Sequence, residues 1–474
     1  MSSEVRELRE IATWSDSADV VVVGLGAAGA AVALEASGAG AETLVLERAA
    51  VGGGTSAMSG GVLYLGGGTT LQKACGFEDS CEAMYAYLMA SCGDAPDEAK
   101  VRLYCEGSCE HYAWLLAQGV PFKSVFYDGC SGEPPTDDGL VWSGSERAHP
   151  FCELARPAPR GHVPQLEHQA GPMLMRALLA AVVASSARVA GGQRCTALVR
   201  DDSGGVVGVI ASGERAIRAR RGVVLTTGGF IHNDAMLVAY QPLLTRCKFR
   251  VGAEGDDGSG IRLGMAVGAG TVRMNAASIS LPVTQPWGLR RGILVNAQGQ
   301  RFVNEDAYYG RLGELALLSH GGRAWLVVDD AIFEQPEYPR NVAAVGESPT
   351  ELARELGLPP GSLESTLALY NRHAARAEDP VFRKAREYVV ALETPPFGAF
   401  DCTTEGSLYA AFTLGGLRTD PDGRVLNPEG RPIPGLFAAG RCTSGLSVGG
   451  YSSGISLGDG TFFGRRAGRS AARA

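Results

Sequence analysis

The 474-residue chain lacks the features that mark several large classes of protein. Basic residues are scarce, since 43 Lys and Arg face 51 Asp and Glu, which gives a net charge of −8. Nucleic acids and anionic membranes select basic surfaces, so we expect no nucleic-acid partner. A purely apolar run near the middle covers only residues 177–184. A membrane-spanning helix needs about 20 such residues, so we expect no integral membrane segment.

Histidine and cysteine do not form metal-binding patterns either. The seven histidines are scattered and contain no HExxH pair, and the eleven cysteines have no repeated spacing. Five cysteines fall between Cys75 and Cys109 without a zinc or iron–sulfur pattern, so we assign no metal and interpret them as reduced thiols. The first 14 residues are charged and lack the apolar core of a secretory signal. The sequence therefore predicts a cytoplasmic protein.

Glycine is the residue in excess. It supplies 65 of 474 positions, almost twice the average share of roughly 7%. The glycines cluster among Val, Leu and Ala, which is typical of tight turns and close backbone approach to a ligand. With 45% hydrophobic and 20% charged residues, the chain is long enough for two or three globular domains. This composition favours an enzyme that binds a cofactor.

The first glycine cluster has the spacing of a dinucleotide-binding turn. Residues 20–23 predict a buried parallel strand, residues 24–29 read GLGAAG, and residues 30–37 predict a helix. A second strand over 43–46 ends at Glu47. In this motif Gly24 makes the turn, Gly26 lets backbone N–H groups approach a pyrophosphate, and Gly29 lets helix and strand pack closely. Glu47 is placed to accept hydrogen bonds from ribose hydroxyls.

Two further segments favour FAD over NAD. Residues 52–61 read GGGTSAMSGG, and such small and hydroxyl side chains can line more of a pyrophosphate and reach a flavin ring. Residues 221–230 predict an apolar strand that ends in a turn of small residues. We expect this strand to return to the cofactor domain beside the first strand.

Together these segments resemble the flavoprotein family of fumarate reductases, succinate dehydrogenases and 3-ketosteroid dehydrogenases. Residues 255–258, 292–305 and 435–440 fit the same family, so the resemblance spans residues 19–468. It implies FAD and an α/β fold with a Rossmann-like FAD-binding domain and an inserted α+β capping domain. The boundaries expected are 1–271 and 396–474 for the FAD-binding domain and 272–395 for the cap, where Pro395 and Pro396 end a helical stretch over 362–390.

The resemblance also implies a set of cofactor-binding residues. Arg441 departs from the Glu that usually follows AAG in this family. No histidine lies in residues 52–61, near which membrane members of the family tether the flavin, so we expect non-covalent FAD. The implied residues are Gly24, Gly26, Ala27, Ala28, Gly29, Glu47, Arg48, Gly54, Thr55, Ser56, Ser59, Gly60, Gly61, Thr227, Gly228, Asp257, Gly440, Arg441, Gly454, Ser456 and Leu457.

The loops expected around the substrate contain phenols and hydroxyls where dicarboxylate enzymes of the family have His and Arg. Neither residue type occurs in 447–460 or 408–416, and Tyr308 and Tyr309 follow the NEDA segment. A dicarboxylate would be left unpaired there, which costs several kcal/mol for each buried charge. A neutral, apolar substrate fits better.

Residues 440–468 resemble the 3-ketosteroid Δ4-(5α)-dehydrogenases. The implied reaction removes hydrogen across C4–C5 of a 3-keto-5α-steroid and gives the 4-ene-3-ketosteroid. A small-molecule steroid is therefore the expected partner, and the electron acceptor stays unknown. Three alternatives stay open: a flavin reductase of an unsaturated ketone, steroid or smaller, a 3-ketosteroid Δ1-dehydrogenase, and an FAD-binding protein without catalysis.

Four hydroxyl side chains are the candidates for proton transfer. Tyr451 and Ser453 form the expected proton-abstracting pair, and Tyr308 or Tyr309 polarises the substrate or relays the proton. A free tyrosine has a pKa near 10. Because Tyr451 precedes a predicted helix over 455–467, we expect the helix N-terminus to favour its phenolate.

Overall fold

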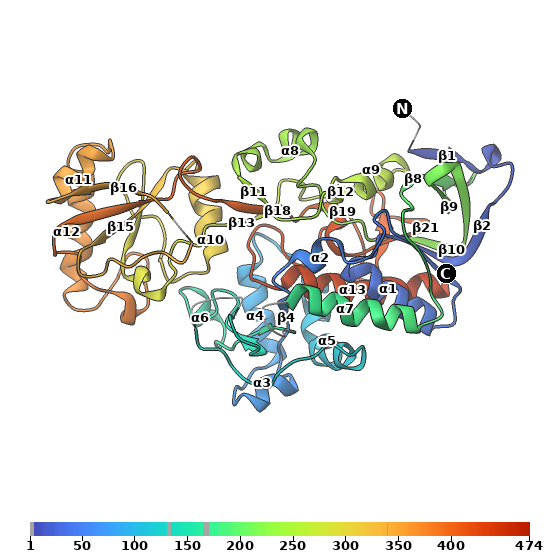
Figure 1. Ribbon diagram of the computed structural model, residues 1–474, viewed down its shortest axis with the longest axis horizontal. Coiled ribbons are helices and arrows are strands. Elements are labelled where there is room, and N and C mark those ends of the chain that lie inside the picture. Colours follow the sequence, from blue (N-terminus) through green and yellow to red (C-terminus); the bar gives the residue numbers. More distant parts are fainter. Residues whose placement is uncertain (1–3, 130–133, 165–169, 339) are drawn as a thin grey trace.

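The molecule is elongated, with a large sheet at one end and a small sheet at the other (Figure 1). The structure is a computed structural model that describes residues 4–129, 134–164, 170–338 and 340–474. Strand β1 (Val5–Glu7), the first described element, belongs to the large sheet, and the C-terminus lies beside the same sheet (Figure 1). Within the described residues, no helix combines the length and the apolar character needed to cross a bilayer.

The large sheet has nine strands and contains the predicted dinucleotide-binding unit. Strand β2 pairs in parallel with β3 and β10, and Val21 of β2 lies opposite Val223 of β10. The expected return of the later strand beside the first is therefore confirmed. The strands in sheet order are β1 (Val5–Glu7), β8 (Cys195–Arg200), β9 (Val206–Ala211), β10 (Arg215–Leu225), β2 (Asp16–Val23), β3 (Thr43–Leu46) and β7 (Arg188–Ala190), with β21 (Pro432–Ala438) on β10 and β20 (Arg424–Leu426) on β21.

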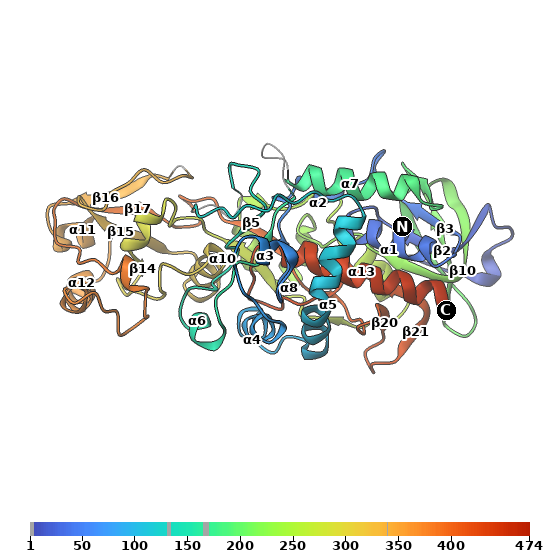
Figure 2. The same ribbon diagram turned by 90° about the horizontal axis from the view of Figure 1, so that it is seen from below.

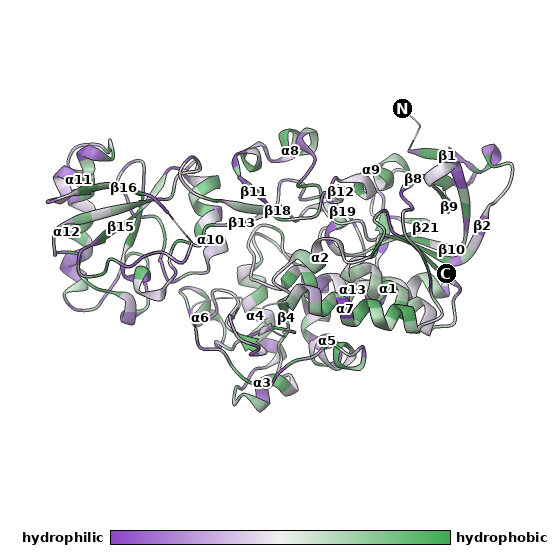
Figure 3. Ribbon diagram, in the orientation of Figure 1, coloured by the Kyte–Doolittle hydropathy of each residue, from purple (hydrophilic) through white to green (hydrophobic). Residues whose placement is uncertain are grey.

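The two faces of β2 contribute to two different cores. Val20 and Val22 pack with α1 (Ala27–Gly38), α7 (Ala170–Ala184) and α13 (Ile455–Arg473). Val21 and Val23 belong to a second core that continues into the small sheet. Alternate side chains of a strand point to opposite faces, so a run of four buried valines supplies both layers. Figures 2 and 3 show the three helices along one side of the sheet, with apolar residues on α1 and α7.

Helices α1 and α13 approach each other through a stripe of glycines on α13. A Cβ atom added at Gly464 would lie 2.7 Å from the Ala28 carbonyl oxygen, and one at Gly468 would lie 2.6 Å from the Val32 oxygen. Only glycine fits at such distances. The two helix backbones therefore contact each other directly, which sets the spacing between their N-terminal ends.

A mainly helical segment covers residues 54–162 beside these helices. Its centre holds an ion pair between Arg160 Nη2 and Asp79 Oδ1 at 2.7 Å, and neither side chain is exposed. The segment consists of α2 (Gly54–Met58), α3 (Thr70–Ala74), α4 (Cys81–Ser91), α5 (Glu98–Ala117), α6 (Phe151–Leu154) and a small sheet of β4 (Leu63–Tyr64), β6 (Gly161–His162) and β5 (Leu140–Val141).

The cap is built on a four-stranded sheet in which the last strand in sequence lies inside. The order is β14 (Ile293–Asn296), β15 (Ala324–Asp329), β17 (Phe397–Asp401) and β16 (Val342–Gly346), with α10 (Tyr309–Glu314), α11 (Pro349–Glu355) and α12 (Ser362–Ala374). Because β17 pairs with both β15 and β16, the expected boundary at residue 395 is one strand too early. We propose instead that the cap ends after Asp401.

Helix α12 is also shorter than the predicted helical stretch over 362–390. It ends at Ala374, and a loop follows in which Asp379 accepts hydrogen bonds from the backbone N–H groups of Phe382 and Lys384. The charged residues after the helix thus belong to a loop, which the Asp379 carboxylate stabilises through these hydrogen bonds. Composition alone did not distinguish this loop from a helix.

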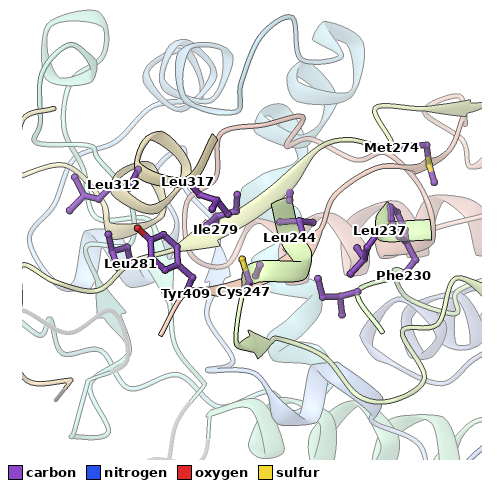
Figure 4. Close-up of a cluster of buried hydrophobic side chains, with 14 of the residues drawn as sticks. Phe230, Leu237, Leu244, Cys247, Met274, Ile279, Leu281, Leu312, Leu317 and Tyr409 are labelled. Carbon is purple, nitrogen blue, oxygen red and sulfur yellow. The ribbon is translucent and has the colours of Figure 1, made fainter. Parts of the chain in front are cut away.

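Between the two sheets the chain forms a narrow apolar junction. Strand β18 (Ala410–Thr413) lies between β11 (Phe249–Arg250) and β13 (Ala277–Ser280), and β12 (Thr271–Val272) pairs with β19 (Gly416–Leu417). Helices α8 (Asp234–Tyr240) and α9 (Ser259–Ala266) lie nearby. Figure 4 shows side chains from both sides meeting here, including Phe230 and Leu237 of the FAD-binding domain and Leu312 and Leu317 of the cap.

A buried cluster of charges holds the cap loops together. The Glu305 carboxylate is fully buried and lies 2.7 Å from Arg301 Nη2 and 2.9 Å from Lys384 Nζ. It also accepts a hydrogen bond from the Leu294 N–H. These cations hold the pKa of Glu305 below its usual value against the effect of burial, and Asp379 contacts Arg301 at 2.8 Å.

Replacing Glu305 by Gln should destabilise the cap. The substitution keeps the size of the side chain but leaves Arg301 and Lys384 buried with one carboxylate less. We expect the free energy of unfolding to fall by about 3–5 kcal/mol, measured by urea denaturation followed by circular dichroism. The matched control is Glu355→Gln, because Glu355 pairs with Arg354 on the exposed surface and such pairs contribute about 0–1 kcal/mol. Equal unfolding midpoints for both variants would contradict this role of Glu305.

Candidate active site

The turn between β2 and α1 has the geometry that the glycine motif requires. Gly24 has a φ of +99°, and an added Cβ would lie 2.7 Å from the Thr226 carbonyl oxygen. Glu47 Oε2 accepts a hydrogen bond from the Leu25 N–H at 2.8 Å, and Oε1 accepts one from Ala49 at 2.8 Å. Glu47 therefore supports the turn itself. Each carboxylate oxygen keeps a lone pair for a ribose hydroxyl.

The N-terminus of α1 is open to an anionic ligand. Its N-cap residue, Gly26, has no capping side chain, and Ser56 Oγ accepts only the Ala27 N–H at 3.1 Å. The first N–H groups of a helix have no partner within the helix, so they bind phosphate well. The hydrogen bond between Ser56 and Ala27 therefore brings the two predicted glycine-rich segments, 24–29 and 52–61, together.

A chain of polar contacts connects three distant parts of the sequence. Thr55 Oγ1 donates to Asp256 Oδ2 at 3.0 Å, and the Arg441 guanidinium pairs with the same carboxylate. The Arg441 guanidinium also lies 5.1 Å from the centre of the Phe412 ring. Arg441, which departs from the family pattern, is therefore held in place by a buried carboxylate.

Asp256 was not among the residues predicted from the sequence. Its side chain is buried against Gly228, whereas the predicted Asp257 pairs with Arg48 at 3.0 Å and with Arg194 at 3.4 Å nearer the surface. Residues 255–258 read GDDG, and a sequence does not reveal which of two adjacent carboxyl groups faces inward.

Most of the other predicted cofactor residues lie in turns or at helix ends. Gly440 approaches Ala28, since an added Cβ would lie 2.9 Å from the Ala28 Cβ. Ser59 donates to the Ser56 carbonyl at 2.8 Å. Gly54 begins α2, Ser59, Gly60 and Gly61 follow it, Gly29 lies in α1, Thr227 and Gly228 follow β10, and Gly454 caps α13, whose first turn contains Ser456 and Leu457.

Tyr451 contacts the N-terminus of α13 as the sequence predicted. Its hydroxyl accepts a hydrogen bond from the Ser456 N–H at 3.1 Å, and its ring packs edge-on against Phe412. Burial nevertheless raises the pKa of Tyr451 above its usual value, an effect larger than that of the hydrogen bond from Ser456. The helix N-terminus therefore favours the phenolate as expected, but desolvation outweighs this effect and leaves the pKa raised.

Tyr308 and Tyr309 both reach Ser453. Each phenol oxygen lies 3.3 Å from Ser453 Oγ, and the two rings are 4.1 Å apart between centres. Burial also raises the pKa of Tyr308 well above its usual value. The choice between the two tyrosines stays open in the structure, since both share one hydroxyl partner.

A network that sequence reasoning missed positions these groups. The Tyr87 hydroxyl accepts the Ser145 N–H at 2.8 Å and lies 2.8 Å from Ser452 Oγ. Ser145 Oγ accepts the Tyr308 N–H at 2.9 Å, so helix α4 of the helical segment connects to both active-site loops. No local motif marks Tyr87, because its partners lie 58 and 365 residues away.

A pocket opens beside Tyr308 and Tyr309, between the FAD-binding domain and the cap. One wall is the segment from Trp142 to Ala148, and the other is formed by Gln285, Trp287, Arg290 and Asp306. Among the described residues, no group of three or more His, Cys, Asp or Glu side chains could hold a metal ion. The site therefore offers two helix N-termini and a group of neutral hydroxyls beside a pocket.

Comparisons with known proteins agree with this geometry. The profile of the FAD binding domain family matches residues 19–457. A solved 3-ketosteroid-Δ4-(5α)-dehydrogenase from Rhodococcus jostii RHA1, in complex with 4-androstene-3,17-dione, is 46% identical, with a TM-score of 0.94 over 99% of this chain and 100% of that one.

Curated relatives support the same assignment. The 3-oxo-5-alpha-steroid 4-dehydrogenase of Comamonas testosteroni is 31% identical over 90% of this chain and 93% of its own length. A fumarate reductase (cytochrome) of Shewanella frigidimarina (strain NCIMB 400) is 26% identical over 97% of this chain and 74% of its own length. The resemblance and the fold class expected from the sequence are thus confirmed. The chain belongs to the FAD binding domain family of flavoproteins, and FAD is its cofactor.

Proposed function

We propose that the protein is an FAD-dependent dehydrogenase that introduces the C4–C5 double bond into 3-keto-5α-steroids. The observation that carries this proposal is the meeting of Tyr451, Ser453 and the Tyr308–Tyr309 pair at the N-terminus of α13. The reacting end of a steroid ketone needs hydroxyl donors, whereas the reacting end of a dicarboxylate needs cations. The relatives that oxidise 3-keto-5α-steroids support the same substrate class.

The residues of the chain act on the C4 proton and the ketone oxygen. The 3-keto group makes the C4 hydrogen acidic, because the charge left behind spreads onto the oxygen as an enolate. Bound FAD supplies the acceptor for the hydride that leaves C5. Tyr451 takes the C4 proton as its phenolate, which a raised pKa makes a strong base, and the proton then leaves to solvent. Ser453 and one of the tyrosines of α10 are placed to relay that proton or to donate to the enolate oxygen.

The cofactor is held by the two helix N-termini. The open first turn of α1 fits the pyrophosphate, and Glu47 is placed for the ribose. Gly454 and Ser456 at the start of α13 suit the flavin ring, with Thr55, Asp256 and Arg441 between them. We propose non-covalent attachment, since residues 52–61 contain no histidine to form a bond to the flavin.

An anaerobic titration tests the proposed reaction directly. A 3-keto-5α-steroid should bleach the yellow absorbance of the bound FAD, and the product should be the conjugated 4-ene-3-ketosteroid, identified by mass spectrometry and ultraviolet absorbance. Succinate should leave the flavin oxidised, because no His or Arg lies in residues 447–460 or 408–416 to pair with it. Bleaching by succinate, or a 1-ene product, would contradict the proposal.

Gly26→Val tests the placement of the cofactor. A branched side chain at the N-terminus of α1 should occupy the space where the pyrophosphate passes, so the variant should purify without FAD. The flavin content is measured by absorbance of the purified protein and of the supernatant after acid precipitation. Gly38→Val is the matched control, because nothing lies within 4 Å of a Cβ added at Gly38 on the same helix. Full flavin content in Gly26→Val would show that the pyrophosphate lies elsewhere.

Tyr451→Phe tests the proton-transfer pair. It removes the hydroxyl and keeps the ring against Phe412, so turnover should fall by the roughly 10²–10⁴-fold typical of general-base catalysis, while FAD stays bound. Ser453→Ala should act in the same direction, and the double variant should be little worse than the poorer single one. Turnover of each variant is measured at steady state with an artificial electron acceptor, and bound FAD is measured from the flavin spectrum.

Two comparisons sharpen this test. Tyr104→Phe removes another buried hydroxyl, bonded to the Tyr64 carbonyl, and should leave turnover close to that of the unchanged protein. Because the pKa of Tyr451 is raised, its phenolate fraction keeps increasing over the whole range from pH 7 to about 10, and turnover should rise with it. Near-normal turnover in Tyr451→Phe would place the base at Tyr308 or Tyr309.

A further inference from the structure

The pocket beside the active-site tyrosines contains two arginines close to one indole. The guanidinium carbon of Arg147 lies 5.0 Å from the centre of the Trp287 ring, and that of Arg290 lies 5.1 Å from it. Arg147 also lies 4.9 Å from Trp142. All four residues line the same pocket as Tyr308 and Tyr309. Two positive charges are thus held close together by aromatic surfaces.

These arginines have no carboxylate partner of their own. Across residues 4–129, 134–164, 170–338 and 340–474, no ion pair within 4.0 Å includes Arg147 or Arg290. Arg290 Nε and Trp287 Nε1 are buried donors without a hydrogen-bond partner. A buried N–H group without an acceptor is costly, so both atoms favour an acceptor in the pocket.

Each of the two carboxyl groups that line the pocket has one oxygen bonded to a backbone N–H group and one buried oxygen without a hydrogen-bond partner. Glu146 Oε2 accepts the Gly144 N–H at 2.9 Å, and Asp306 Oδ2 accepts the Ala385 N–H at 3.0 Å. Burial raises the pKa of both carboxyl groups. Burial lowers the pKa of Arg290, Tyr388 and Asp306 partly offset that effect, and Arg147 adds to it. An anion between the arginines would stabilise both cations.

We propose that Arg147, Arg290 and Trp287 bind a carboxylate carried by the steroid at the end remote from its 3-keto group. The preferred substrates are then 3-keto-5α-steroids with an acidic side chain. This inference rests on the proposed function, because Tyr308 and Tyr309 at the same pocket are assigned to the ketone end. The pocket combines phenols, which can donate to a ketone, with guanidinium groups, which bind carboxylates.

The test compares an acidic steroid with its neutral carboxamide, first as 4-ene-3-keto products and then as 3-keto-5α substrates. Product binding to the holoenzyme, measured by equilibrium dialysis, needs no turnover and so separates this inference from the proposed reaction. We expect the acid to bind about tenfold or more tightly than the amide, the effect of a charge-assisted pair in a partly buried site. The ratio should fall as ionic strength increases.

Variants identify the residues responsible. Arg290→Gln and Arg147→Gln should each bring the acid-to-amide ratio of affinities close to one. Arg291→Gln is the matched control, because Arg291 belongs to the same 3-10 turn (Trp287–Arg291) but is exposed and does not line the pocket. Its ratio should stay as in the unchanged protein.

Three results would overturn the inference. They are equal affinities for acid and amide in the unchanged protein, a loss of preference in Arg291→Gln equal to that in Arg290→Gln, and tighter binding of the neutral steroid when free acetate is added. The last result would assign the arginines to a free anion. If both product steroids bind as expected but neither substrate bleaches the flavin, the proposed reaction fails and the carboxylate site stands.

Discussion

The direct contact between the backbones of α1 and α13 determines where the chemistry takes place. Glycines at 464 and 468 allow this contact, because any larger side chain would meet the carbonyl oxygens of Ala28 and Val32. Each helix begins at a glycine without a capping side chain, Gly26 or Gly454. We propose that one N-terminus binds the pyrophosphate and the other binds the reacting end of the cofactor. The distance between these two functions is therefore set by helix packing rather than by a loop.

The sequence predicted those parts of the fold and site that depend on local pattern. The strand, turn and helix over residues 19–46 are confirmed, because a buried valine run and a glycine turn leave little choice of structure. Asp256, Tyr87 and Ser145 were missed, since each acts through partners far away in the sequence. The end of the cap was placed too early for the same reason. Nothing local in residues 397–401 shows that this strand pairs with β15 and β16.

The active site separates hydroxyl groups from charges. Ser453 contacts the phenols of Tyr308 and Tyr309, and burial raises the pKa of Tyr308 and of Tyr451. Charged groups occur at the borders, where Arg441 is paired with Asp256 and where Arg147 and Arg290 face the pocket. A neutral centre suits a ketone, because its charge develops only during reaction and donors that are already oriented can stabilise it then.

The order of strands in the large sheet has a consequence for biosynthesis. Strand β10 pairs with β2, about 200 residues earlier, and with β21, about 200 residues later. The sheet is incomplete until residue 438 has left the ribosome, and α13 follows it. The cap sheet, in contrast, lies within residues 293–401 and can form before the chain is finished. Long-range pairing slows folding, so the cofactor-binding half is the last part to become protected from proteolysis and aggregation.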